Sequence, residues 1–278
     1  MSRRGFTLVE LLMAMTVMGI LGIALARMLV SDSRFVSRQG AMLDARQAAR
    51  SALNLLDRDL RMVSDSGVVS ATPDSVVLRV PYAFGVTCRN VSNDRIMSLL
   101  PTDSVAYASA VPAGFAWLDP TIGTYRVTDG ATVASYTDPS PCAVDSIRVL
   151  TGGRLVAVTG LPPGKPSSPD SANVAYLYQK ITYRFGPSSD LPGRRALWRK
   201  AGAAAAEEIA APFDSTAQFQ CLIGTQFSAV TCPPSGGVGV IRGIEVYLVG
   251  ASASAPEGAS APETFPLVTR IPFLNRGM

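Results

Sequence analysis

Residues able to do acid–base or metal chemistry are few in this chain of 278 residues, which contains no histidine. That excludes a Ser-His-Asp triad, a histidine metal site and an imidazole pH switch. Two carboxylate pairs stand close in sequence, Asp57 with Asp59 and Glu207 with Glu208. Such pairs on a helix, or beside an alanine run, are far more often solvated than acid–base couples. Because we find no phosphate-binding loop, nucleophile elbow or dinucleotide fingerprint, we expect no enzyme and no cofactor.

Four cysteines are the next candidates for chemistry, Cys88, Cys142, Cys221 and Cys232. None lies in a C-x-x-C pair and no histidine can complete a zinc site, so we expect no structural metal. Export of the domain would favour disulfides, and four cysteines allow three connectivities. Short sequence separation favours Cys221–Cys232, which leaves Cys88–Cys142 by elimination. Buried free thiols are the alternative.

Glu10 is the one charged residue in an apolar run from Phe6 to Ala26. As a helix, this run would span about 31 Å, the thickness of a bilayer's hydrocarbon core. A carboxylate there costs roughly 2–3 kcal/mol near the helix centre and less near an end. Glu10 is therefore either tolerated near the headgroups or paired with a positive charge. Cleavage after Gly5 would create such a charge, the α-amino group of Phe6.

The flanks of the apolar run indicate its orientation. Arg3 and Arg4 precede it and predict a cytoplasmic N-terminus, with the rest of the chain outside the cytoplasm. Arg27 follows the run and can snorkel to the far interface. A cleavable signal peptide is the alternative, because residues 24–26 give a formal A-x-A site. The length of the run and its carboxylate favour a membrane anchor instead.

The residues from Gly5 to Leu12 read GFTLVELL after a short basic leader. This segment resembles the N-terminal signal of type IV pilins and type II secretion pseudopilins. The resemblance implies that a prepilin peptidase cuts between Gly5 and Phe6 and N-methylates Phe6, and that Glu10 serves in assembly. A small Gly5 lets a protease approach the backbone closely. In an apolar filament core, Glu10 can neutralise a neighbouring subunit's amine through a weakly screened ion pair.

Helical patterning continues beyond the apolar run. Apolar residues recur every three or four positions and predict one helix from Phe6 to about Val63, about 87 Å long. They are Ala45, Ala49, Leu53, Leu56, Leu60 and Val63. We expect this stripe to pack on a sheet, and Asp57 to pair with Arg61.

The remainder is rich in turn residues and strand-like segments, with 24 glycines and 20 prolines in the chain. We expect an α+β fold, in which a long N-terminal helix packs on a mainly antiparallel β-sheet domain, the lollipop shape of pilins. Strands are expected at residues 74–82, 145–150, 154–159, 174–185, 195–200, 240–249 and 267–273. Residues 250–262 read as a flexible loop.

The expected organisation has four parts. They are a leader at 1–5, a transmembrane or filament-core helix at 6–30, its amphipathic continuation at 31–63 and an exported β-rich domain at 64–278. Looser similarity to J-type pseudopilins and W-type minor pilins lies in residues 54–61, 181–185, 197–199 and 269–275. Residues 84–145 match no segment of those families, and we expect an insertion or an elaborated sheet there.

The resemblance implies a minor pilin or pseudopilin that helps prime or assemble a type IV pilus or type II secretion pseudopilus, near its tip. Implied partners are the prepilin peptidase, other minor pilins or pseudopilins, the major pilin and inner-membrane lipid. The implied location is the inner membrane, spanned once with a periplasmic C-terminal domain, and then a surface pilus or periplasmic pseudopilus. The alternatives are an adhesin-like or DNA-uptake subunit of such a filament and a membrane-anchored periplasmic enzyme. A net charge of +4 does not by itself indicate nucleic acid.

Overall fold

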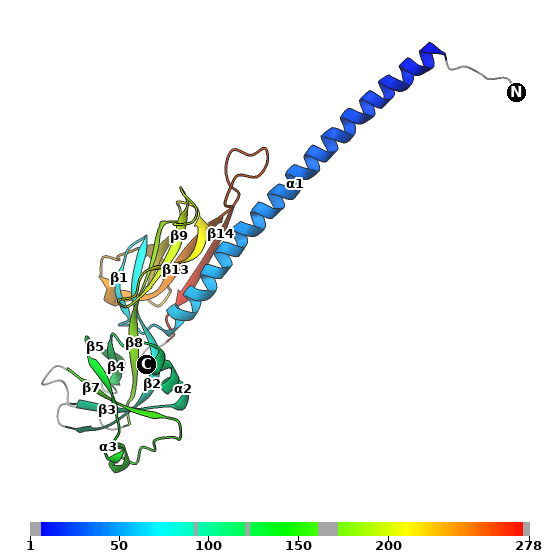
Figure 1. Ribbon diagram of the computed structural model, residues 1–278. Coiled ribbons are helices and arrows are strands. Elements are labelled where there is room, and N and C mark those ends of the chain that lie inside the picture. The colour runs from blue at the N-terminus through cyan, green and yellow to red at the C-terminus, as the bar shows by residue number, and fades with distance from the viewer. Residues whose placement is uncertain (1–6, 92–93, 120–122, 161–171, 275–278) are drawn as a thin grey trace.

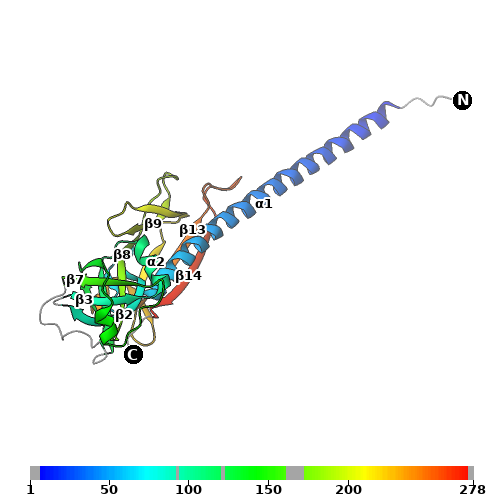
Figure 2. The same cartoon turned by 60° about the horizontal axis from the view of Figure 1, so that its bottom comes forward.

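The structure is a computed structural model, which describes residues 7–91, 94–119, 123–160 and 172–274. Helix α1 (Leu8–Met62) has 55 residues and is about 82 Å long at 1.5 Å per residue. Its first half stands free, whereas its second half lies on a β-rich head (Figures 1 and 2). The expected α+β fold, a long helix packed on an antiparallel sheet, is confirmed.

Local sequence explains both ends of α1. Thr7 is the N-cap: its hydroxyl accepts the backbone N–H of Glu10, whose carboxylate accepts the backbone N–H of Thr7. At the other end Val63 adopts an extended conformation, and its N–H bonds to the carbonyl of Leu60. These limits agree with the predicted helix, although its expected first residue, Phe6, lies outside the described residues.

The head contains a 14-stranded sheet, and its strand pairs are antiparallel. The main strand order is β12-β11-β13-β10-β9-β8-β2-β3-β7-β6. Off this path, β1 pairs with β2, β14 with β13, and β4 with both β5 and β8. The strands are β1 (Val68–Ala71), β2 (Ser75–Val91), β3 (Asp94–Leu99), β4 (Gly114–Asp119), β5 (Thr124–Asp129), β6 (Thr132–Tyr136), β7 (Arg154–Thr159), β8 (Val174–Pro187), β9 (Arg195–Ala201), β10 (Glu207–Phe213), β11 (Gln218–Ile223), β12 (Ser228–Thr231), β13 (Ile241–Ala251) and β14 (Thr264–Pro272). The short helices are α2 (Pro101–Ser109), α3 (Ser140–Val144) and the 3-10 turn η1 (Val238–Val240).

One half of the head, here called the helix-bound lobe, packs against α1. It comprises β1, β9 to β14, and the halves of β2 and β8 that pair between Ser75–Val80 and Gln179–Arg184. Ala49, Leu56, Leu60 and Val63 of the predicted stripe are buried in the core of this lobe, and Leu53 is partly buried against it. Ala45 is also buried. From the sheet, alternate residues meet this stripe: Ile181, Tyr183 and Phe185 of β8, and Ile244, Val246 and Leu248 of β13.

Strand β13 passes so close to α1 that one position accepts only glycine. A Cβ added to Gly250 would lie 2.0 Å from the carbonyl oxygen of Ala45 and 3.3 Å from the Cβ of Ala49. On the helix side the facing residues are alanines, since Ala45, Ala48, Ala49 and Ala52 are all buried. Small side chains on both elements therefore set this close approach.

The other half of the head, the distal lobe, lies beyond the C-terminal end of α1 (Figure 1). Strands β2 and β8 are long enough to run through both lobes and remain paired as far as Val86 and Val174. Strands β3 to β7, with α2 and α3, complete the distal lobe around a separate apolar core. Residues 84–145, expected to form an insertion or elaborated sheet, supply most of these elements.

Six of the seven expected strands correspond to β2, β7, β8, β9, β13 and β14. The strand expected at residues 145–150 is wrong. The chain turns there, because Ser146 has a φ of 59° and the N–H of Ile147 returns to the carbonyl of Cys142 at the end of α3. Both edges of the nearby β7 are already paired, with β3 and β6.

Candidate functional site

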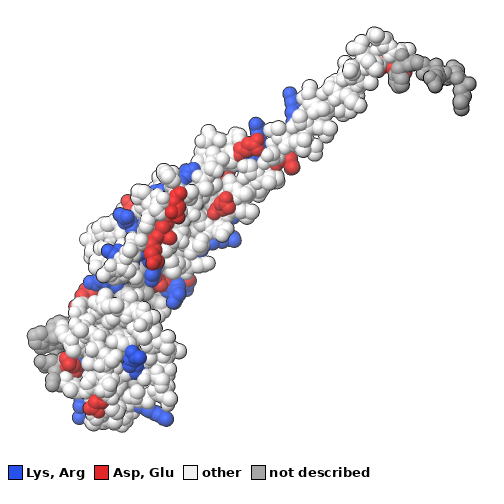
Figure 3. Space-filling view, viewed as in Figure 1, with Lys and Arg blue, Asp and Glu red and all other residues white. Residues whose placement is uncertain are grey.

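The free half of α1 exposes apolar side chains around its circumference. Its large apolar residues from Leu8 to Leu29 are between 54% and 79% exposed. Figure 3 shows this segment as almost without charge, in contrast to the head. Among the described residues, α1 is the one helix long and apolar enough to cross a membrane. A helix that is apolar on all sides needs a bilayer or other helices around it.

Glu10 is the single charged residue between Leu8 and Ala26. Its Oε2 accepts the backbone N–H of Thr7 at 3.2 Å and the hydroxyl of Thr7 at 3.1 Å. The carboxylate therefore folds back toward the helix N-terminus, where free N–H groups and the macrodipole favour an anion. Sequence reasoning singled out Glu10 but missed Thr7, which the T-x-x-E spacing of a capping box could have revealed.

The expected processing residues precede this cap. Gly5 and Phe6 lie outside the described residues, so the cleavage between them and the methylation of Phe6 stay predictions. The leader at residues 1–5 lies outside them as well.

A buried polar contact seats the second half of α1 on the head. Oδ2 of Asp59 accepts the hydroxyl of Tyr183 at 2.6 Å and Nη2 of Arg199 at 3.4 Å. Asp59 is only 8% exposed. Burial, together with the negative charge of Asp59, raises the pKa of Tyr183 above its usual range. The phenol thus remains protonated and donates to Asp59.

This geometry overturns the expectation that Asp57 and Asp59 form a solvated pair. Side chains two positions apart point about 200° apart around a helix. Asp57 pairs with Arg61 at 2.7 Å, as expected, whereas Asp59 faces the sheet. The available signal was its spacing of three from Leu56 and four from Val63, which places Asp59 on the apolar stripe.

The second carboxylate pair, Glu207 and Glu208, lies in β10. Glu208 accepts the hydroxyl of Ser188 at 2.6 Å and the backbone N–H of Ser189 at 2.7 Å. Burial opposes ionisation, but these hydrogen bonds outweigh it and hold the pKa of Glu208 below its usual range. Glu208 therefore ties the β8–β9 turn to β10. No group of His, Cys, Asp or Glu that could hold a metal ion occurs in the described ranges.

The loop between β13 and β14 reaches along α1 toward its free half (Figure 1). Its Glu257 accepts the hydroxyl of Ser33 at 2.8 Å and donates its backbone N–H to the hydroxyl of Ser37 at 3.0 Å. Arg38 of α1 also lies 3.9 Å from Glu263. The loop expected from composition is present, and in the structure it is fastened to the helix.

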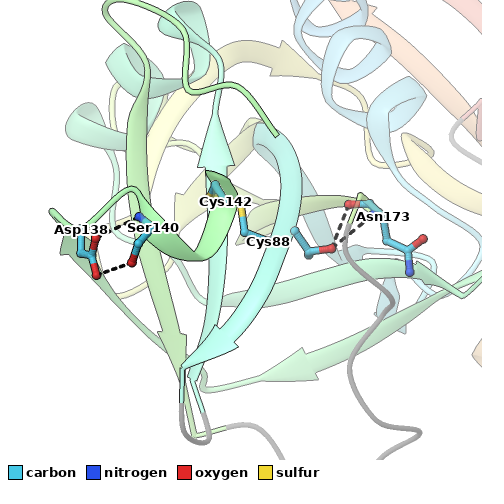
Figure 4. The surroundings of a disulfide bond; sticks show 6 residues. Cys88, Asp138, Ser140, Cys142 and Asn173 are labelled. Carbon is cyan, nitrogen blue, oxygen red and sulfur yellow. Dashed lines mark hydrogen bonds between the residues drawn. A yellow bond between two sulfur atoms is a disulfide. The ribbon is translucent and has the colours of Figure 1, made fainter. Parts of the chain in front are cut away.

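Each lobe contains one disulfide. Cys88 of β2 is joined to Cys142 of α3 in the distal lobe, as Figure 4 shows. In the helix-bound lobe, Cys221 of β11 is joined to Cys232, which follows β12. Near the first bond, the carboxylate of Asp138 accepts the backbone N–H and the hydroxyl of Ser140 at the start of α3 (Figure 4). These crosslinks suit an oxidising compartment.

Comparison with protein-family models matches residues 1–26 to the prokaryotic N-terminal methylation motif. The matched segment contains the expected cleavage residues, Glu10 and most of the exposed apolar helix. Searches among curated proteins and among solved structures found no match.

Proposed function

We propose that this chain, whose N-terminus is a type IV pilin-like prepilin signal, is a minor pilin or pseudopilin that helps prime or assemble a filament. One observation carries the proposal: the methylation motif contains the capped start of α1 and most of its exposed apolar half. Such a helix needs a bilayer or a bundle of similar helices. A pilin-type subunit uses both in turn, the membrane before assembly and the filament core afterwards.

Processing at the cytoplasmic face is the first step of this proposal. The prepilin peptidase removes residues 1–5 by cutting between Gly5 and Phe6, and it methylates the new amine of Phe6. Arg3 and Arg4 hold the uncut N-terminus in the cytoplasm. The helix at 6–30 then anchors the subunit, its continuation at 31–63 carries the head, and residues 64–278 lie in the periplasm.

Glu10 makes the assembly contact in this proposal. In the separate subunit its carboxylate is satisfied by the neutral donors of Thr7. In a filament, the Phe6 amine of a neighbouring subunit would offer Glu10 a full positive charge. A charge-assisted hydrogen bond in apolar surroundings is stronger than a neutral one. The capping contact thus protects the carboxylate until a neighbour replaces it.

The distal lobe supports a place near the filament tip. It lies beyond the C-terminal end of α1, on the side opposite the apolar half of the helix (Figure 1). Subunits with parallel core helices stack along a filament axis, so a lobe in that place would compete for space with the next head. A subunit at the tip of the filament avoids this conflict, because no other head lies beyond its distal lobe.

The intact mass of full-length protein tests the processing on which this function depends. Protein purified from membranes of a host with prepilin peptidase should lack residues 1–5 and carry one added methyl group. Protein from a host without the peptidase should keep Met1. A mature N-terminus at Met1 in the first host, or a cut after Ala26, would contradict the proposal.

Abundance in sheared filaments tests the minor role separately. We expect the processed subunit in that fraction at far lower copy number than the main subunit, measured by quantitative peptide mass spectrometry. Equal copy numbers would contradict a role as minor subunit while leaving processing intact.

A further inference from the structure

A groove lies between α1 and the β13–β14 loop, where the apolar half of the helix ends. Its volume is about 700 Å³. Toward the apolar half it is lined by Ile23, Ala26 and Val30, with Arg27 among them. Toward the head it is lined by Arg34 and Arg38, with Phe35 between them. The groove thus begins beside the apolar half of the helix, and its arginines are spread from Arg27 to Arg38 toward the head.

Two arginines of this groove share one face of α1. Arg27 and Arg34 are seven residues apart, which is nearly two turns and about 10 Å along the axis. Within the described ranges, neither has an ion pair or hydrogen bond to another side chain. Glu257 is the carboxylate in the lining, and its Oε2 already accepts the hydroxyl of Ser33. The groove therefore carries an excess of positive charge.

Backbone closes the end toward the head. Gly258 has a φ of +78°, and a Cβ added there would lie 3.0 Å from Nε of Arg34. Both the left-handed conformation and the close approach suit glycine. The hydrogen bonds from Glu257 to Ser33 and Ser37 hold this part of the loop against the helix.

We propose that this groove binds the headgroup of an anionic phospholipid in the membrane that holds the unassembled subunit. The run from Phe6 to Ala26 matches the hydrocarbon thickness, so Arg27 lies where phospholipid phosphates begin. Guanidinium groups bind phosphate oxygens through paired N–H donors. A lipid acyl chain would continue along Ile23 toward the apolar half of α1. Polarity along the groove thus follows the polarity of a phospholipid.

The inference rests on the membrane-anchored stage of the proposed function and adds the lipid class and its binding residues. Because the loop belongs to the head, a lipid held between Arg34 and the loop would fasten the head to the membrane surface. Withdrawal of α1 into a filament would have to break that contact.

Native mass spectrometry of the full chain in detergent, with phosphatidylglycerol and phosphatidylcholine supplied in equal amounts, tests the proposal. We expect the wild type to retain phosphatidylglycerol with about thirtyfold preference, since each of two interfacial arginines contributes about 1 kcal/mol. The double variant Arg27→Gln/Arg34→Gln should lose this preference. The matched control Arg50→Gln/Arg58→Gln removes the same charge from exposed positions of α1 and should keep it.

Further measurements distinguish a lipid from other possible ligands of the groove. An excess of inorganic phosphate should not displace the lipid; displacement would identify a free anion as the ligand and overturn the proposal. Equal losses in the two double variants, or an acidic neighbouring subunit bound in place of lipid, would also overturn it. Flotation with pure phosphatidylcholine vesicles measures membrane insertion independently of lipid preference. A chain that fails to insert contradicts the anchor, whereas insertion without lipid preference contradicts the groove alone.

Discussion

The phenol of Tyr183 in β8 donates a 2.6 Å hydrogen bond to the carboxylate of Asp59 in α1. The two residues are 124 positions apart in sequence, and the contact is buried. It joins the strand that runs through both lobes to the helix that projects from the head. The projecting helix and the head are therefore connected by a specific polar contact as well as by the apolar stripe.

Removing the Tyr183 hydroxyl should weaken the attachment of α1 to the head. Tyr183→Phe leaves Asp59 buried with the longer contact to Arg199, so we expect a loss of about 1.5–3 kcal/mol in the free energy of unfolding. Urea denaturation of the full chain in detergent measures it. Tyr247→Phe, at a half-buried position whose hydroxyl has no hydrogen bond to a described residue, should change stability by less than about 0.5 kcal/mol. Equal effects of the two changes would refute a special role for Tyr183.

Adding one methyl group at Gly250 should separate the helix from the sheet. Gly250→Ala places Cβ 2.0 Å from the carbonyl oxygen of Ala45, so backbone must move, at a cost of about 3 kcal/mol. Gly40→Ala is the control, because Gly40 lies in α1 and an added Cβ there meets nothing within 4 Å. That change should stabilise α1 by up to about 1 kcal/mol. A neutral Gly250→Ala, read by thermal denaturation, would mean that the close approach is not required.

The lobes are also joined by an ionic cluster that should make stability depend on pH. Asp129 of β5 is 2.6 Å from Arg79, 3.0 Å from Lys180 and 2.8 Å from the hydroxyl of Tyr178. The hydrogen bond from Arg79 is the main cause that holds the pKa of Asp129 far below its usual range.

Because the folded pKa of Asp129 is depressed, its stabilisation should be full above the unfolded value of about 3.9 and lost as pH falls below it. We expect the stability gap between wild type and Asp129→Asn to be wide near neutral pH and to narrow steadily below about pH 4. Urea unfolding across that range measures the gap. A gap independent of pH would contradict this account.

Peptide mapping without reductant should recover two linked pairs, Cys221 with Cys232 and Cys88 with Cys142. Replacing the first pair by alanine should lower stability by about 3 kcal/mol and replacing the second by about 4 kcal/mol, since the second closes a longer loop in the unfolded chain. Quantitative alkylation of all four thiols in unreduced protein would refute the pairing.

Changing Glu10 tests the assembly contact itself. Glu10→Ala should leave membrane insertion and cleavage intact, because the segment becomes more apolar and Gly5 and Phe6 are untouched. Recovery in sheared filaments should fall to background, with Glu10→Asp intermediate because its charge has a shorter reach. Thr16→Ala, another polar-to-apolar change on the free half of α1, is the control and should assemble normally. If the Glu10→Ala subunit is recovered at the wild-type level, Glu10 is only tolerated near the headgroups.

Several features of the helix could be predicted from the sequence because they depend on near neighbours. An apolar run, a stripe with spacings of three and four, and the pair Asp57–Arg61 all involve residues within one or two turns. The same is true of Glu10, whose place in the motif and in the capping box depends on the few residues before it. For the longer strands, alternation of buried and exposed residues was sufficient.

Tertiary structure decided what distant segments do together. Strand β4 pairs with β8 about sixty residues later, and nothing local in its six residues indicates that partner. The spacing of Asp59 places it on the apolar stripe, but its partner Tyr183 is decided only when the sheet packs on α1. The groove forms only because the loop carrying Gly258 returns to Arg34. Helical pattern is set by contacts one turn apart, whereas sheet order, buried polar partners and grooves are set by long-range packing, which a short window of sequence does not contain.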